Sequence, residues 1–374
     1  MTQPATLTEN RPEPALVQAP VVFACSACGE CCTSVRMPID TYRAEYLAEQ
    51  PWFRKRLADY DARLSRGDDD GEWILPLKPD RSCVFLAGDK RCLIEANAGK
   101  DWKPLECRRF PFASVRYAGE TLYDVSAACR TVSGELLGLL APVVPAPGTF
   151  PDPDAEPQTL PESLRFGRFR RVSTRRWLAP APALRAIGDS DADPLVTLRL
   201  INRALPGLLQ EKEPLKALPS AAWQRWLWRS LPFWFARNPY GLWTRWQLLR
   251  GRQLDDPLVF GATVTLPAPG QAALAPAANR LINAFAVNIL QRRVVLAHDM
   301  PIANLLLMAT IAASLTAWHA RILAVQQGLA ETGVAETRLA IRLVERYYTG
   351  HQPRFLAEMR RGGWPVALCR LLLA

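Results

Sequence analysis

The sequence lacks the local features that mark several common classes of protein. Its first twenty residues (MTQPATLTENRPEPALVQAP) show no basic start followed by an apolar stretch, so we expect no export signal there. No glycine-rich turn follows a predicted strand, which argues against a Rossmann-type methyl-donor site. Internal repeats and the common nucleic-acid-binding motifs are also missing, so specific nucleic-acid binding is not predicted.

Charge is distributed unevenly along the 374 residues, whose net charge is +10. Residues 1–130 contain 18 Lys and Arg against 19 Asp and Glu, whereas residues 131–374 contain 28 against 17. Nearly all of the excess is arginine. A basic region beside a neutral one predicts an anionic partner but does not identify it.

Cysteine is distributed just as unevenly. The chain is far longer than the small secreted domains that need disulfides, so together with the missing export signal we expect a cytoplasmic protein with reduced thiols. Eight of the nine cysteines precede residue 131: Cys25, Cys28, Cys31, Cys32, Cys83, Cys92, Cys107 and Cys129.

Composition divides the chain into four parts. Residues 1–20 are expected to be disordered, and 21–140 to form a small, irregular, cysteine-rich metal-binding domain. Residues 141–163, with seven prolines, are predicted to be a linker, and 164–374 a basic, mainly helical domain. The predicted fold class is therefore α+β, mainly α.

Periodicity predicts the individual elements. Strands are expected at Trp73–Leu77 and Thr121–Val125. Helices are expected at Asp40–Arg66, Ser133–Leu140, Leu195–Leu209, Ala221–Leu231, Tyr240–Leu249, Ala277–Leu296, Ile302–Gly328 and Glu336–Tyr348.

One segment, MPIANLLLMATIAASLTAW between Asp299 and His319, has 19 residues without a charge. Its length reaches a bilayer span, but it contains proline, asparagine, threonine and serine. We therefore predict a buried central helix rather than a membrane span.

The strongest motif is Phe23-Ala-Cys-Ser-Ala-Cys-Gly-Glu-Cys-Cys32. A Cys-x2-Cys step lets two thiolates reach one metal from a single turn, and Gly29 gives that turn backbone freedom. A bound zinc or iron stabilises thiolates by lowering their pKa. A thioredoxin-like site needs one isolated Cys-x2-Cys step, not four thiols within eight residues. The motif therefore predicts binding of a metal or of an iron–sulfur cluster.

The other four cysteines lie in apolar surroundings: Ser82-Cys-Val-Phe-Leu86, Arg91-Cys-Leu-Ile94, Pro104-Leu-Glu-Cys-Arg-Arg-Phe-Pro-Phe112 and Val125-Ser-Ala-Ala-Cys129. Together with the first motif, these fragments of residues 23–130 resemble the CxxCxxCC (YkgJ-type) family of zinc- or iron-chelating proteins. The resemblance implies that all eight cysteines are candidate ligands of zinc, iron or a 4Fe-4S cluster. Eight thiolates exceed the needs of one such centre. Either two centres exist, or some cysteines are structural or open for chemistry.

The same pattern is similar to flagellin lysine-N-methylases, which join it to a helical C-terminal region and use S-adenosylmethionine. This resemblance implies a lysine-bearing protein substrate of the flagellin kind and makes Arg346 and His351 candidate catalytic residues, although Tyr347, Tyr348 and His351 more often serve packing. A Cys-x3-Cys-x2-Cys radical motif is missing because residue 35 is valine. The alternative is a non-catalytic module that chelates, delivers or senses zinc or iron.

Three further features have more than one interpretation. Arg108 and Arg109 could hydrogen-bond cluster sulfurs or be solvated. The tryptophan-rich segment 221–235 is predicted to pack into a core, with peripheral membrane contact or base stacking as alternatives. The arginine-rich segment 165–176 is either a grip for an acidic partner or a solvated basic strand.

Overall fold

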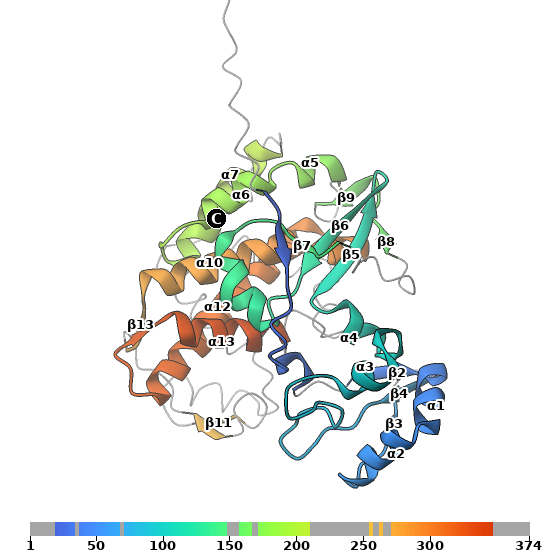
Figure 1. Cartoon of the computed structure of the whole chain (residues 1–374). Coiled ribbons are helices and arrows are strands. Elements are labelled where there is room, and N and C mark those ends of the chain that lie inside the picture. Colours follow the sequence, from blue (N-terminus) through green and yellow to red (C-terminus); the bar gives the residue numbers. More distant parts are fainter. Residues whose placement is uncertain are drawn as a thin grey trace, which may run out of the picture.

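A computed structural model describes residues 19–33, 37–67, 71–147, 157–166, 171–209, 254–256, 262–264 and 271–346 (Figure 1). Over these ranges the chain is a mixed α+β structure in which helices predominate, as the sequence predicts. The helices predicted at 221–231 and 240–249, with the tryptophan-rich segment, and the candidate residue His351 lie outside the described residues.

The elements before residue 147 are short. Figure 1 shows α1 to α3 and β2 to β4 gathered at one end of the molecule, away from α6 and α7. The helices are α1 (Thr41–Glu49), α2 (Pro51–Ala58), α3 (Leu93–Ala98) and α4 (Leu105–Arg109). The strands are β1 (Val21–Phe23), β2 (Pro38–Asp40), β3 (Ser65–Arg66), β4 (Glu72–Ile74), β5 (Phe112–Tyr117), β6 (Glu120–Val125) and β7 (Val143–Pro145).

The single helix predicted for Asp40–Arg66 is wrong, because the chain breaks after Glu49. Gln50 is extended, and Pro51, which has no N–H to donate, starts α2 as a new helix. The segment ends in strand β3 rather than in helix. Likewise, the helix predicted at Ser133–Leu140 is a π-helical turn, Val132–Leu136, followed by a 3-10 turn, Leu137–Leu139.

Asp40 fixes the start of α1. Its carboxylate accepts a hydrogen bond from the backbone N–H of Arg43 at 2.9 Å, as an N-cap does, and pairs with the Arg43 guanidinium at 2.7 Å. Burial tends to raise the pKa of Asp40, but the bonds from Arg43 outweigh it and hold this pKa below its usual value.

Three small sheets organise this part of the chain. β2, β4 and β3 form an antiparallel sheet, and β5 pairs with β6 as a hairpin. β8 (Gln158–Thr159) adds to β5 in parallel, and β1 pairs in parallel with β7. Residues of the predicted linker therefore supply β7 and β8, which add to sheets formed by strands that precede the linker.

The later part of the chain is helical, with short strands between helices. Its helices are α5 (Thr174–Leu178), α6 (Ala181–Gly188), α7 (Pro194–Leu208), α10 (Pro276–Leu290), α11 (Arg293–Ala297), α12 (Ile302–Gln326) and α13 (Val334–Val344). Its strands are β9 (Ser163–Arg165), β10 (Arg171–Ser173), β11 (Leu254–Asp256), β12 (Ala262–Val264), β13 (Ala273–Leu274) and β14 (Glu331–Thr332).

Helix α10 is the hub of this region, since it packs against α6, α7, α12 and α13. Helix α12 is the one helix in the described ranges that is long and apolar enough to cross a membrane, and 89% of its most apolar window is buried inside the protein. The sequence predicts a buried central helix here, and the burial of α12 agrees with that prediction.

Two large hydrophobic cores, besides a small cluster of Ala320, Leu323 and Ala340, lie in the described part of the chain. The smaller one consists of eight buried residues between 39 and 94, namely Ile39, Ala44, Leu47, Phe53, Leu75, Val84, Phe85 and Ile94. The larger one runs from Val115 to Val344 and includes the inner faces of α7, α10 and α12. Strand β5 and the turns after Cys129 thus pack with the helices, although they lie close to cysteines in the sequence.

Candidate metal centre

All eight N-terminal cysteines are free thiols. Cys25 is exposed, Cys129 is buried, and the other six are half-buried. They come from five separate segments, so the fold and not the sequence alone determines which thiols meet. The contacts divide them into two groups.

The first group forms where the end of the Cys-rich turn meets the loop before α3. Thr33 and Ser82 form a β-bridge, and the backbone N–H of Cys83 donates to the carbonyl of Cys32 at 2.7 Å. A second bridge joins Leu86 to Cys92. These bridges bring the Cys31–Cys32 turn, Cys83 and Cys92 together although they lie up to sixty residues apart.

Electrostatic interactions add Cys107 of α4 to this group. Burial raises the pKa of the Cys107 thiol, and the neighbouring Cys83, Cys92 and Cys31 raise it further. Burial also raises the pKa of Cys83 to about 11, with Cys92 adding to the effect. The pKa of Cys31 is raised by the hydrogen bond between its thiol and that of Cys32, whose sulfur lies 3.9 Å away, and also by burial.

Lys103 supplies a positive charge to the same group. Its Nζ donates to Glu95 Oε2 at 2.7 Å, and its side chain is largely buried. Burial tends to lower the pKa of Lys103, but Glu95, Cys92 and Cys107 outweigh it and raise this pKa. The ammonium group therefore stabilises negative charge on these sulfurs.

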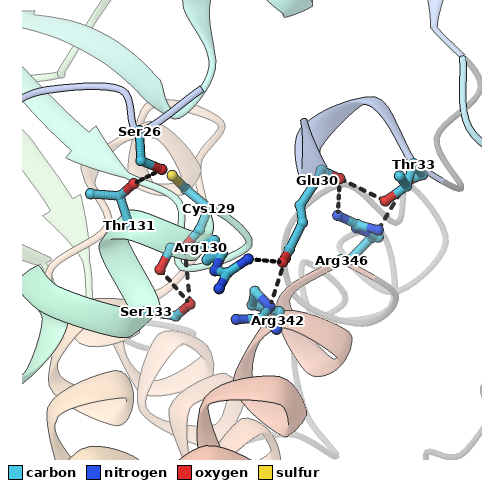
Figure 2. Close-up of polar contacts among 9 residues, drawn as sticks. All are labelled: Ser26, Glu30, Thr33, Cys129, Arg130, Thr131, Ser133, Arg342 and Arg346. Carbon is cyan, nitrogen blue, oxygen red and sulfur yellow. Dashed lines mark hydrogen bonds and ion pairs between the residues drawn. The ribbon is translucent and has the colours of Figure 1, made fainter. Parts of the chain in front are cut away.

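The second group consists of Cys25, Cys28 and Cys129. Figure 2 shows Cys129 beside the hydrogen bond that joins Ser26 to Thr131, whose hydroxyl oxygens are 2.9 Å apart. This bond holds the Cys-x2-Cys turn against the segment that carries Cys129. Burial raises the pKa of Cys129, and the thiols of Cys25 and Cys28 raise it further.

Glu30, inside the cysteine motif, is held by arginines from two distant segments (Figure 2). Its carboxylate pairs with Arg130 Nη1 at 3.1 Å and with Arg342 Nε of α13 at 3.3 Å. Arg346, just after α13, donates to the carbonyls of Thr33 at 2.9 Å and of Glu30 at 3.1 Å. We call Arg130, Arg342 and Arg346 the arginine clamp.

Burial lowers the pKa of Arg342 in the clamp. Glu30 opposes this shift, Arg130 and Arg346 reinforce it, and Cys28 again opposes it. Arg342 therefore interacts both with the acid that it pairs with and with a thiol of the second group. The clamp is electrostatically part of the cysteine site.

A buried ion pair fixes the end of α13 that carries the clamp. Arg292 Nη2 lies 2.6 Å from Glu345 Oε2, and both side chains are almost fully buried. Ser126, at the end of β6, donates to the other oxygen of Glu345 at 3.0 Å. The segment before Cys129 and the segment before Arg346 are thus held to each other.

The donor set suits zinc, iron or an iron–sulfur cluster, because thiolates are the preferred ligands of these soft or borderline metals. In the described part of the chain, no three or more Cys, His, Asp or Glu side chains are already arranged to hold a metal ion. The thiols therefore match in chemistry and neighbourhood, and coordination requires their sulfurs to move closer together.

The structure places several predicted residues. All eight cysteines lie in one group or the other, and Arg346 contacts the cysteine turn directly. Arg108 is buried near Asp101, with Nη1 to Oδ1 at 4.0 Å, so the solvated interpretation is wrong for this residue. In the arginine-rich segment, Arg165 binds Asp299 and Arg171 binds Ser163, both within the protein.

Four residues of the site are not predicted by the sequence, namely Glu30, Lys103, Arg130 and Arg342. One signal was available, because Arg342 and Arg346 are four residues apart and so lie on one face of a helix. The others become significant only through long-range contacts, which no local pattern reveals.

No protein-family model, no curated protein and no solved structure matches this chain. The resemblance to the CxxCxxCC family therefore stays a prediction carried by cysteine spacing. Any functional proposal has to stand on the thiol groups and the arginine clamp.

Proposed function

We propose that the cysteine-rich region binds zinc, iron or an iron–sulfur cluster in a reducing cytoplasm. The observation that supports this proposal is that eight free thiols from five segments gather in two groups, each next to basic side chains. Free thiols at such density serve coordination better than packing, since the region already has an apolar core of its own.

The raised pKa values support the same proposal. Without a bound metal, buried thiols such as Cys83 and Cys107 hold their protons at neutral pH. A bound metal replaces these protons, and the free energy of binding then adds to the free energy of folding. Such a contribution suits a region whose core has only eight buried apolar residues.

The residues of the chain have separate roles in this proposal. The eight cysteines are the candidate ligands: Cys25, Cys28, Cys31, Cys32, Cys83, Cys92, Cys107 and Cys129. Lys103 and Arg342 offset the negative charge of the thiolates, and Glu30 holds the turn in place. When bound, zinc supplies a structural link or a Lewis acid, and an iron–sulfur cluster supplies one-electron chemistry.

Metal analysis with an absorption spectrum of anaerobically purified protein tests the proposal. A broad charge-transfer band is expected for an iron–sulfur cluster, and a colourless protein that holds zinc is expected for a zinc centre. A well-folded chain that retains neither metal after purification and reconstitution would contradict the proposal.

A second candidate function is protein lysine N-methylation with S-adenosylmethionine. It is favoured by the contact of Arg346 with the cysteine turn, which joins a helical-region residue to the proposed metal site. Titration of S-adenosylmethionine into the metal-loaded protein, followed by a methyl-transfer assay on lysine-bearing proteins such as flagellin, tests this candidate.

The matched variants for that assay are Arg346→Ala and Arg338→Ala, since Arg338 is an exposed arginine of α13. Loss of donor binding in the first variant alone supports a role of Arg346. If the donor does not bind the native protein and no lysine gains a methyl group, the enzyme candidate is dropped. Chelation, delivery or sensing of zinc or iron then remains.

A further inference from the structure

We propose that the thiols form two separate centres, a closed one of the first group and an open one of Cys25, Cys28 and Cys129 that takes a small anion as its fourth ligand. This inference rests on the proposed function and deepens it. It assigns different tasks to cysteines that the sequence motif treats alike.

The separation follows from the backbone. The Thr33–Ser82 and Leu86–Cys92 bridges tie the first group to the loop before α3. The Ser26–Thr131 bond ties the second group to the segment after β6 (Figure 2). Although Cys28 and Cys31 are three residues apart, the Gly29 turn between them directs the chain from one group to the other, with φ at +73°.

The numbers of thiols differ between the groups. The first group has Cys31, Cys83, Cys92 and Cys107, with Cys32 beside Cys31, which fills the four positions of a tetrahedral zinc or of a four-iron cluster. The second group has three thiols. Closed sets of four thiolates are structural, whereas three protein ligands leave a position for an outside ligand.

The charge beside the second group indicates which ligand this is. Arg130 and Arg342 pair with the carboxylate of Glu30, and Arg346 donates to backbone carbonyls, so the clamp and Glu30 together carry two positive charges in excess. A divalent metal with three thiolates carries one negative charge. The sum is positive, and an anion in the open position neutralises it, because opposite charges in a partly buried site attract strongly.

Access to this centre is also consistent with an outside ligand. Cys25 is exposed and the side chain of Arg130 is 60% exposed, so the second group borders solvent. By contrast, all five cysteines of the first group are half-buried, and none of them is exposed. An open position at Cys25, Cys28 and Cys129 can therefore be reached without unfolding the turn.

Cobalt(II) substitution of the whole chain, with azide as the anion, tests the inference, because the d–d absorption of cobalt reports its coordination. We expect two cobalt equivalents in the native protein and about one in Cys25→Ser, Cys129→Ser or Cys92→Ser. Azide should change the spectrum of the native protein and of Cys92→Ser, but not of the other two variants. Cys25 is exposed, so its variant keeps the test valid if Cys129→Ser fails to fold.

The clamp gives a second measurement. Arg342→Gln should weaken azide binding roughly tenfold and leave the cobalt stoichiometry unchanged, as expected for loss of one partly buried charge. The inference would be overturned if the native protein bound a single cobalt equivalent that variants of either group lose, or if the azide effect survived in Cys25→Ser. Neither outcome would overturn the proposed function. A native chain that binds no cobalt would overturn the inference, and the proposed function would fall only if the chain also retained neither zinc nor iron.

Discussion

The helical region and the cysteine-rich region differ in what holds their side chains in place. The helical region has a continuous core in which α12 is buried along most of its length. The cysteine-rich region has a separate core of eight buried apolar residues, and bridges and ion pairs also hold its segments together. Stabilisation by burial of apolar surface is non-directional and needs no ligand, whereas stabilisation by thiol groups depends on the metal that they bind. Under the metal-binding proposal, the helical region carries its own stability, and the cysteine-rich region acquires part of its stability from the metal.

A large-to-small substitution in the helical core should have the largest effect on the free energy of unfolding, because this region depends on apolar burial. Phe285 of α10 is fully buried, so Phe285→Ala should lower the free energy of unfolding by about 3–5 kcal/mol. The loss should be equal with and without a chelator, since no thiol is involved. Leu200→Ala, at an exposed site of α7, should change it by less than about 0.5 kcal/mol in the same denaturant titration.

Substitution of a proposed ligand should act on the other region alone. Cys28→Ser and Cys31→Ser should each lower the metal content and remove roughly 2.7 kcal/mol at a free metal concentration about a hundredfold above Kd. Metal analysis and hydrogen exchange of residues 37–67 measure these effects. Cys369→Ser, a cysteine outside the N-terminal set, is the matched control. Full metal content and unchanged exchange in both variants would contradict the metal-binding proposal.

The arginine clamp joins the two regions, so its loss should couple them less tightly. Glu30→Gln removes the charge that pairs with Arg130 and Arg342, and we expect a cost of about 1 kcal/mol that shrinks with added salt. Hydrogen exchange should accelerate both in the cysteine turn and at the end of α13. The exposed Glu135 provides the control variant Glu135→Gln. Acceleration in one segment only would show that the clamp does not link them.

The most local expected effect is at the start of α1. Asp40→Ala should cost about 1 kcal/mol at pH 7, as expected for the loss of an N-cap. Because the pKa of Asp40 is lowered in the folded protein, its contribution is complete above the usual value of 3.8 and disappears as the pH falls through the lowered one. Denaturation curves at several pH values measure this. Glu45→Ala, on the exposed face of α1, should show no such dependence.

The sequence predicted the elements that periodicity defines. Helices α7 and α12 lie where apolar spacing places them, because α7 buries one face and α12 most of its circumference. Strand β6 also lies where it is predicted, although its residues are half-buried or exposed. The break at Pro51 could have been predicted, since proline removes a helix hydrogen bond. The break between α10 and α11 has no such signal in the sequence.

The candidate site was predictable in composition but not in arrangement. Cysteine spacing identified the thiols, since Cys-x2-Cys steps are local. Their division into two groups depends on contacts such as that of Ser26 with Thr131, 105 residues away. Such pairings follow from packing of the whole chain. Cysteine spacing alone therefore does not decide between one metal centre and two.

The contact between Arg346 and Thr33 joins residues 313 positions apart, and this distance has a consequence for synthesis of the protein. A ribosome that adds about 5–20 residues per second needs roughly 15–60 s to pass from Thr33 to Arg346. During that interval the cysteine turn has emerged, while the segment that clamps it does not yet exist. The nascent chain therefore presents its first thiols unclamped, and any metal or chaperone that meets them during translation meets a looser site than the finished protein offers.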